Sequence, residues 1–309
     1  MKTGSNPALR VATDEEQIVF QAETLASDSQ WGKAASLIEN YRRSNILSIE
    51  SLGKLAYYHS HAGDYDSAIS LYLELIQQQP SEAWWFYCLG FQYQKKEQWS
   101  DAIAAYSESS RLAPRLLKAV LRLGDAYREA GQGAWALSTY RQGIQSYQNL
   151  PADRRQKLGD VYAQLCSHAA HILLEKSDGN SEEVQEGIKL FKETVATSPN
   201  DADAWYSLRN ALLDVDQAEE ALDCLEKARN LNPKKEYIPH KIAQAHLKKN
   251  NPDEALREYE QIPQYKRTAY ILRGMGQCHM AKNEAMGRQP RNISRQVNRS
   301  RGNSTTTGT

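Results

Sequence analysis

The chain has 309 residues, of which 40% are hydrophobic and 25% charged, and its formal net charge is zero. This composition is typical of a soluble globular or repeat protein and argues against a protein built mainly to coat nucleic acid. The sequence has no run of about 18 apolar residues for a membrane span, and its first residues, MKTGSNPALRVATDEEQ, have no apolar core for a secretory signal.

A pattern repeats at a constant interval along most of the chain. Leu55, Leu89 and Leu123 stand one interval apart, and each is followed by alanine or glycine. The period is about 34 residues, a length typical of stacked helical repeats. The opening stretch from Glu15 fits more loosely. Further matches at the same period are Ala68, Ala102 and Ala136; Tyr72, Tyr106 and Tyr140; Pro80 and Pro114; and Pro199 and Pro233.

Each block of this pattern predicts two amphipathic helices joined by a short turn. In residues 81–114 the first helix should run to about Lys96, and the second should be capped by Ser100 or Asp101 and end before Pro114. The small residue after each leucine should let the two helices approach closely, with Gly90 facing Ala102.

The period is interrupted between residues 151 and 200. The interval from Pro114 to Pro199 is two full periods and half of another one. Apolar spacing after Pro151 predicts one over-long first helix, then a loop near residues 177–180 and a normal second helix that contains Phe191. This expansion is either a surface insertion without a role or an extended helix that shapes a groove or contacts a partner.

The chain ends in a polar segment after one more repeat and a terminal helix within residues 265–283. Residues 283–309 contain almost no apolar side chain and are predicted to be a disordered basic tail. Residues 281–309 hold six basic groups and one acidic group, so their charge is about +5 and that of the preceding chain about −5.

The repeats resemble the tetratricopeptide repeat family, most closely in ADAWYSLRNALLDVDQAEEALDCLEKARNLNP, residues 202–233. The resemblance implies an all-α, right-handed superhelical solenoid of antiparallel helix pairs. It has about seven repeats, one of them expanded (about 151–200). Arg209 departs from the family pattern, which has glycine or alanine there, and we expect that helix pair to be slightly splayed. The expected boundaries are 1–13 (flexible), 14–282 (solenoid) and 283–309 (tail).

In this family the first helix of each repeat lines a concave groove, so the resemblance also implies a site for a partner peptide or helix. The segment AWWFYCLGFQY (83–93) then divides between two faces of one helix. Phe86, Leu89, Gly90 and Tyr93 are expected to hold the fold, whereas the fold should not need Trp84, Tyr87 and Phe91. Trp85 and Cys88 are expected to meet the preceding repeat. Gly53, Tyr57 and Phe91 stand where the chaperone-binding subset of the family has its carboxylate clamp, so that clamp is not expected. The predicted groove residues are Tyr57, Trp84, Tyr87, Phe91, Lys95, Asp125, Arg128, Tyr206, Asn210, His240 and Gln244.

Other chemistry has little support in the sequence. Cys166, His168 and His171 are close together, but a zinc site usually needs four ligands and no second pair stands at finger-like spacing, so no metal or cofactor is expected. No nucleotide-binding or hydrolase motif is present, and we expect no catalysis. Four widely spaced cysteines favour reduced thiols and a cytoplasmic protein.

The leading hypothesis is therefore a non-catalytic scaffold or adaptor that binds a protein partner. Two alternatives remain open. One is an RNA-associated repeat protein that uses its arginine-rich tail for phosphate contacts, although a solenoid charge near −5 disfavours a nucleic-acid groove. The other is a regulatory arm of an enzyme whose catalytic domain lies elsewhere. The oligomeric state is not predicted.

Overall fold

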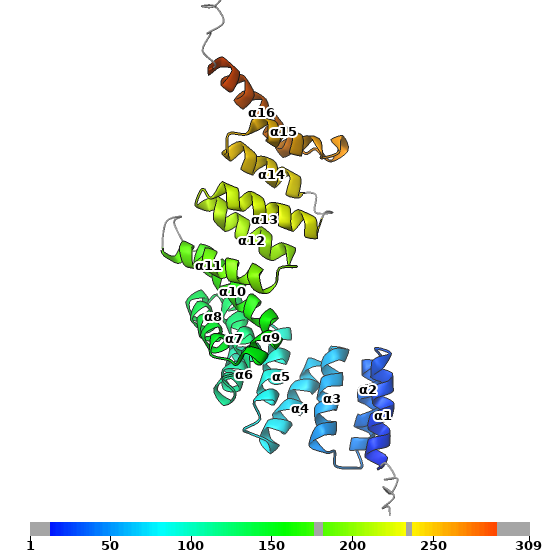
Figure 1. Cartoon of the computed structure of the whole chain (residues 1–309). Helices are drawn as coiled ribbons and strands as arrows, with labels where there is room; N and C mark the ends of the chain where they lie inside the picture. The colour runs from blue at the N-terminus through cyan, green and yellow to red at the C-terminus, as the bar shows by residue number, and fades with distance from the viewer. Residues whose placement is uncertain (1–12, 176–181, 233–236, 289–309) are drawn as a thin grey trace, which may run out of the picture. The chain divides into compact units, whose positions relative to one another are not determined.

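The computed structural model describes residues 13–175, 182–232 and 237–288, which form helices and no β-strand (Figure 1). The chain divides into two compact units, unit 1 (residues 1–175) and unit 2 (176–309). In unit 1 the helices are α1 (Asp14–Ser27), α2 (Trp31–Arg42), α3 (Ile49–Ala62), α4 (Tyr65–Gln78), α5 (Ala83–Lys95), α6 (Trp99–Leu112), α7 (Leu117–Glu129), α8 (Gly133–Gln148), α9 (Ala152–Lys157) and α10 (Gly159–Glu175). In unit 2 they are α11 (Glu182–Thr197), α12 (Ala202–Asp214), α13 (Ala218–Leu231), α14 (Tyr237–Lys248), α15 (Pro252–Glu260), the 3₁₀ turn η1 (Gln264–Lys266) and α16 (Ala269–Arg288).

The tight turn inside each helix pair recurs with the period of the sequence pattern. Gly63 ends α3 in the left-handed region, with φ of 83°, and its N–H bonds back to carbonyls of the last helical turn. Glycine suits this position because a side chain is strained at positive φ. In most other repeats a non-glycine residue adopts this strained backbone conformation at the equivalent turn position. The residues with positive φ at these turns are Ser29, Gly63, Glu97 and Gly131 in unit 1, and Asp216 and Asn250 in unit 2.

The small residue after each leucine does allow the two helices of a pair to approach closely, and the group that packs against it is an aromatic ring of the second helix. A Cβ atom added at Gly90 would lie 2.7 Å from the Tyr106 ring, and one at Gly124 would overlap the Tyr140 ring. Both tyrosines are fully buried. The group nearest to Gly90 is therefore the ring of Tyr106, one turn further along α6 than the predicted neighbour Ala102.

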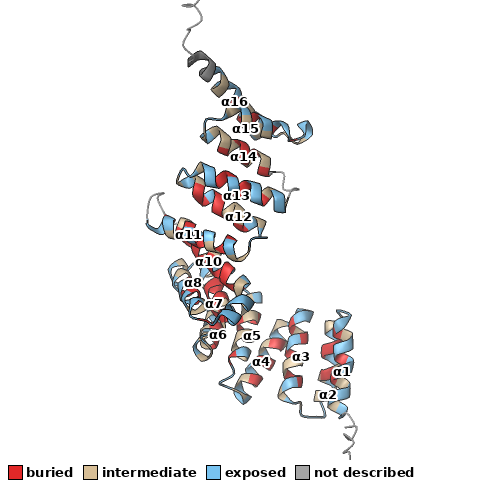
Figure 2. Cartoon of the chain, viewed as in Figure 1, coloured by how far each residue is buried: buried red, intermediate tan, exposed pale blue. Residues whose placement is uncertain are grey.

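Within each unit, consecutive helices pack on one another, except that α8 packs on α10 and not on the short α9 between them (Figure 2). The buried residues form several apolar clusters along the array. Trp85 and Cys88 belong to the core cluster of the preceding repeats, as predicted: the Trp85 ring lies 6.4 Å from that of Tyr72 in α4. The helix pairs therefore stack as a helical repeat array in which each repeat buries the apolar face of its neighbour.

Two local predictions are wrong. The second helix of the 81–114 repeat begins at Trp99 after Gln98, without a side-chain cap, so neither Ser100 nor Asp101 caps it. The single long helix after Pro151 is instead two helices, α9 and α10, separated at Leu158. There the Tyr147 hydroxyl donates a 3.0 Å hydrogen bond to the Arg155 carbonyl, which competes with the helical bond to that oxygen.

The expanded repeat is shared between the two units. Its first helix, α10, packs on α8 and α7 in unit 1, whereas its second helix, α11, packs on α12 in unit 2. Residues 176–181, which contain most of the predicted loop, lie outside the described residues. The region 151–200 therefore contains the boundary between the compact units.

The helical part of the chain extends further than the expected limit at residue 282, because α16 continues to Arg288. Ala285 and Met286 favour helix, while Pro290 disfavours helical backbone at the residue before it. The predicted flexible N-terminus up to residue 12 and the tail from 289 to 309 lie outside the described residues. None of the described helices is both long and apolar enough to cross a bilayer.

Candidate functional site

The side chains predicted to line a groove in unit 1 lie on the first helices of successive repeats, α3, α5 and α7. We define the aromatic face as Tyr57, Trp84, Tyr87, Phe91 and Lys95. Tyr57 and Phe91 occupy equivalent positions, one period apart, on the neighbouring repeats. Tyr57 is 47% exposed and Trp84 45% exposed, which is unusual for large aromatic side chains in a folded array.

Tyr57 belongs to an aromatic group that the sequence analysis did not find. Its ring lies 4.0 Å from that of His61 and 5.9 Å, edge-on, from that of Trp31 in α2. Beside this group, Trp31 and Ala62 line an open hollow of about 440 Å³. His61 follows Tyr57 by one helical turn, and this i, i+4 spacing was the signal that could have placed it on the same face.

The α5 part of the aromatic face combines exposed and structural side chains. Trp84 stacks on Tyr87 with ring centroids 5.1 Å apart, and the Lys95 ammonium lies 5.2 Å from the centre of the Phe91 ring. Tyr87 also packs against Tyr106 at 5.8 Å and joins a core cluster. The hypothesis that the fold does not need Tyr87 is therefore wrong, and Trp84 is the side chain of the pair that is open to a partner.

Asp125 was predicted to face the groove, but it is buried and only 6% of its surface is exposed. Its carboxylate accepts a 2.8 Å hydrogen bond from the Tyr140 hydroxyl and lies 2.9 Å from His168 Nδ1 and 3.3 Å from an Arg122 nitrogen. Burial raises the pKa of Asp125, but the bonds from His168 and Tyr140 and the Arg122 charge outweigh it, so the pKa lies below its ordinary value. This group ties α7 to α8 and α10, which is a structural role.

Arg128, the other predicted residue of α7, is exposed, as a groove residue should be. Its guanidinium pairs with the neighbouring Glu129 at 3.0 Å. An exposed pair of this kind contributes little to stability, so Arg128 can exchange this partner for another one.

In unit 2 the predicted residues Tyr206 and Asn210 lie on α12, and His240 and Gln244 lie on α14. Asn210 is exposed, whereas His240 is only 5% exposed and packs 4.5 Å from the ring of Tyr270 in α16. The expectation that His240 is an open groove residue is therefore wrong. Gln244 donates a 2.9 Å hydrogen bond to the Tyr270 hydroxyl, so Tyr270, which the sequence analysis missed, joins α14 to α16.

Arg209 does not splay its helix pair as predicted. The residue is 2% exposed, and α12 packs on α13 as α7 packs on α8. In the repeat register, Leu225 stands where other repeats have Tyr106 and Tyr140. The smaller leucine leaves volume for the aliphatic part of the arginine side chain.

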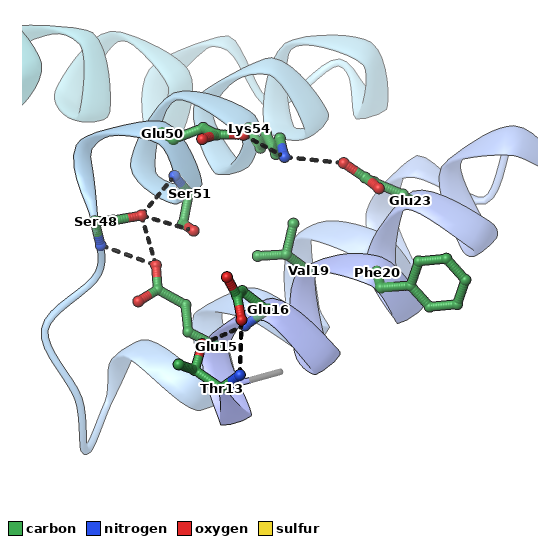
Figure 3. Close-up of a pocket in the computed structure, with 10 residues that line it drawn as sticks. All are labelled: Thr13, Glu15, Glu16, Val19, Phe20, Glu23, Ser48, Glu50, Ser51 and Lys54. Carbon is green, nitrogen blue, oxygen red and sulfur yellow. Dashed lines mark hydrogen bonds and ion pairs between the residues drawn. The ribbon is translucent and has the colours of Figure 1, made fainter. Parts of the chain in front are cut away.

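A pocket of about 460 Å³ lies between the first turns of α1 and the start of α3 (Figure 3). Its acidic side chains already have partners: Ser48 donates to Glu15 from its N–H and its hydroxyl, and Lys54 pairs with Glu23 and Glu50. Burial raises the pKa of Glu15, yet the serine hydrogen bonds lower it below its ordinary value. These contacts hold α1 against α3. They occupy the polar side chains of the pocket that could otherwise bind a ligand.

Catalytic or metal chemistry has no evident centre in the described part of the chain. No group of three histidine, cysteine or acidic side chains is placed to hold a metal ion there. Cys166 is fully buried, and His168 is paired with Asp125, so the cluster noted in the sequence contributes to packing.

Comparison with known proteins adds one curated relative and several similar folds. No family model matches the chain. Tetratricopeptide repeat protein 37 of Xenopus laevis is 26% identical over 234 residues, which cover 66% of this chain and 15% of the relative. The chain therefore spans only about 15% of that relative's length.

Two solved structures show the same fold. The C-terminal part of a tetratricopeptide repeat protein from Cytophaga hutchinsonii superposes with a TM-score of 0.63 at 15% identity, over 83% of this chain and 99% of that chain. A tetratricopeptide repeat protein from Parabacteroides merdae superposes with a TM-score of 0.52 at 12% identity, over 86% and 98% of the two chains. At these identities the likeness concerns the fold alone.

Proposed function

Because the chain is a tetratricopeptide repeat protein, we propose that it is a non-catalytic scaffold that binds an apolar segment of a partner protein on the aromatic face of unit 1. The observation that carries this proposal is the exposure of Tyr57 and Trp84, at 47% and 45%, on the first helices of adjacent repeats. Neither side chain is needed to fill the core. Large aromatic side chains that a fold leaves half open are typical anchors of protein interfaces.

The chemistry of the face indicates what the partner segment presents. Trp84 and Tyr57 offer flat apolar surface, and the hollow beside Trp31 has room for a protruding side chain. Lys95 on α5 and Arg128 on α7 add exposed cationic groups. The preferred ligand is therefore a helical or extended segment with apolar side chains and acidic groups beside them.

The proposal is tested by the double substitution Trp84→Ala and Phe91→Ala. We expect the helical content to stay unchanged and partner binding to weaken at least about tenfold, as is usual when interface anchors are truncated. The measurement is affinity purification followed by quantitative mass spectrometry, with circular dichroism on the same samples. Tyr87 is left intact because its contact with Tyr106 supports the core.

Trp135→Ala is the matched control. Trp135 is 64% exposed and also stacks on a tyrosine, Tyr127, but it lies on α8, a second helix of its repeat. Its removal should leave partner recovery unchanged. The proposal is abandoned if the double variant recovers the same partners as the unaltered protein.

A further inference from the structure

Unit 2 contains a buried guanidinium that has no acidic partner among the residues that the structure describes. Arg209 is 2% exposed, and none of the described carboxylates forms an ion pair with it. One of its terminal nitrogens donates to the Asn210 side chain, its guanidinium lies 5.4 Å from the Tyr206 ring, and its Nε has no hydrogen-bond partner. Another arginine of the unit, Arg229, has the usual arrangement, with Glu258 at 3.2 Å.

This arrangement is costly in the free protein. Burial lowers the pKa of Arg209. Tyr206, through its electrostatic interaction and a side-chain hydrogen bond, and Asp214, through space, offset that effect only in part. A buried charge is normally matched by an ion pair and by a full set of hydrogen bonds. The chain could have used alanine here, as it does at Ala243 in the next repeat. The unmatched charge and the unused N–H group therefore point to a ligand that supplies negative charge.

The side chains in contact with Arg209 are uncharged, while Asp214 acts on it through space and Lys241 acts on the nearby His240. His240 is 5% exposed, and neither ring nitrogen has a hydrogen-bond partner. Burial, followed by the charges of Lys241 and Arg209, lowers the pKa of His240 to about 4, so it is neutral at pH 7. Tyr270, which is 53% exposed, packs on His240 and forms the outer side of this cluster.

We propose that Arg209 anchors a binding site for a single carboxylate, with His240, Asn210 and Tyr270 around it, and that the ligand is an aspartate or glutamate side chain of a partner protein. One guanidinium whose direct contacts, Asn210 and Tyr206, are uncharged matches one negative charge. The planar guanidinium also fits the two oxygens of a carboxylate. A phosphate dianion would bring a second negative charge, and the described part of unit 2 holds no second buried cation to match it. This site lies in unit 2 and is independent of the aromatic face of unit 1.

The first test uses acetate as the probe on the whole chain. The Nε–H group of Arg209, which is buried and unbonded, should give a separate signal in a ¹H–¹⁵N spectrum of arginine side chains. We expect acetate to shift this signal in a saturable manner, while sodium chloride at equal ionic strength does not. Absence of a saturable shift would contradict the proposal.

The second test compares Arg209→Met with Arg229→Met. Methionine can fill the space of the arginine stem without a charge, so the first variant should melt about 3 °C higher than the unaltered protein and lose the response to acetate. The second leaves Glu258 without its partner and should melt lower. If Arg209→Met also melts lower, the guanidinium is matched within the protein and the proposed site is wrong.

The third test identifies the source of the anion with peptides blocked at both ends, so that only a side chain can carry charge. Their central residue is glutamate, glutamine or phosphoserine in otherwise equal sequences. We expect the glutamate set to bind at least tenfold more tightly than the other two, and Arg209→Met to remove the difference. Tighter binding of phosphoserine would overturn the assignment to a carboxylate. Trp84→Ala should leave all three affinities unchanged, which separates this test from that of the aromatic face.

Discussion

Ala102→Glu is expected to unfold the middle of unit 1. Ala102 is fully buried in α6, in a cluster with Tyr106, Leu123 and Ala126. Glutamate would bring extra volume and an unmatched charge into this contact between helices. We expect a loss of about 4–5 kcal/mol, at the upper end of what single substitutions cause. Thermal melts followed by circular dichroism measure it, and hydrogen exchange should locate the loss of protection in α5 to α7.

Ala104→Glu is the matched control, because Ala104 lies two residues away on the same helix and is exposed. It should change the free energy of unfolding by less than about 0.5 kcal/mol. An Ala102→Glu protein that melts like the Ala104→Glu protein would show that the helix register described for α6 is wrong.

Asp125→Ala is expected to have the next largest effect. The substitution leaves the Tyr140 hydroxyl and His168 without their shared acceptor in a buried place. Removing one member of a buried charged group costs about 3–5 kcal/mol. Asp66→Ala should cost almost nothing in comparison, because Asp66 pairs with Lys96 at the surface and its side chain is 81% exposed. Chemical denaturation of both variants measures the difference, and equal losses would contradict the account of Asp125.

The same carboxylate predicts a dependence of stability on pH. Its pKa in the folded protein lies below the ordinary value of about 3.9. The unfolded chain therefore binds the proton more readily, so the stabilisation is complete above about pH 4 and is lost as the pH falls through the lower, folded-state pKa. Asp125→Ala should flatten the stability curve in that acid range, and an unchanged acid slope would assign the effect to other carboxyl groups.

The sequence predicts the helix pairs well because their packing depends on residues within one period. Leu89 and Gly90 recur one period later as Leu123 and Gly124, so one repeat explains the next. Contacts between residues of different repeats that do not recur at the repeat interval cannot be predicted from this pattern. Asp125 occupies an outward position of its own helix, yet His168, which helps to enclose it, comes from α10, within the segment where the repeat is interrupted.

The candidate sites show the same limit. The repeat register of the family predicts Tyr57 and Trp84 on the groove face, and both side chains are exposed. The burial of His240 could not be predicted in this way, because Tyr270 on the terminal helix covers it. Arg209 is visible in the sequence only as an exception to the small residue of the repeat. The proposal that Arg209 binds an anion depends on its burial and on its lack of an acidic partner among the described residues. Neither property can be read from the spacing of residues in the sequence.

Photo-crosslinking from the aromatic face tests the central proposal most directly. A benzophenone amino acid is placed at Trp84 in one protein and at Trp135 in another, both of which are exposed aromatic positions in unit 1. The proposal predicts that position 84 forms crosslinks to an apolar segment of a partner, mapped by mass spectrometry, and that position 135 does not. Equal crosslinking from both positions, or crosslinking from position 135 alone, would contradict it.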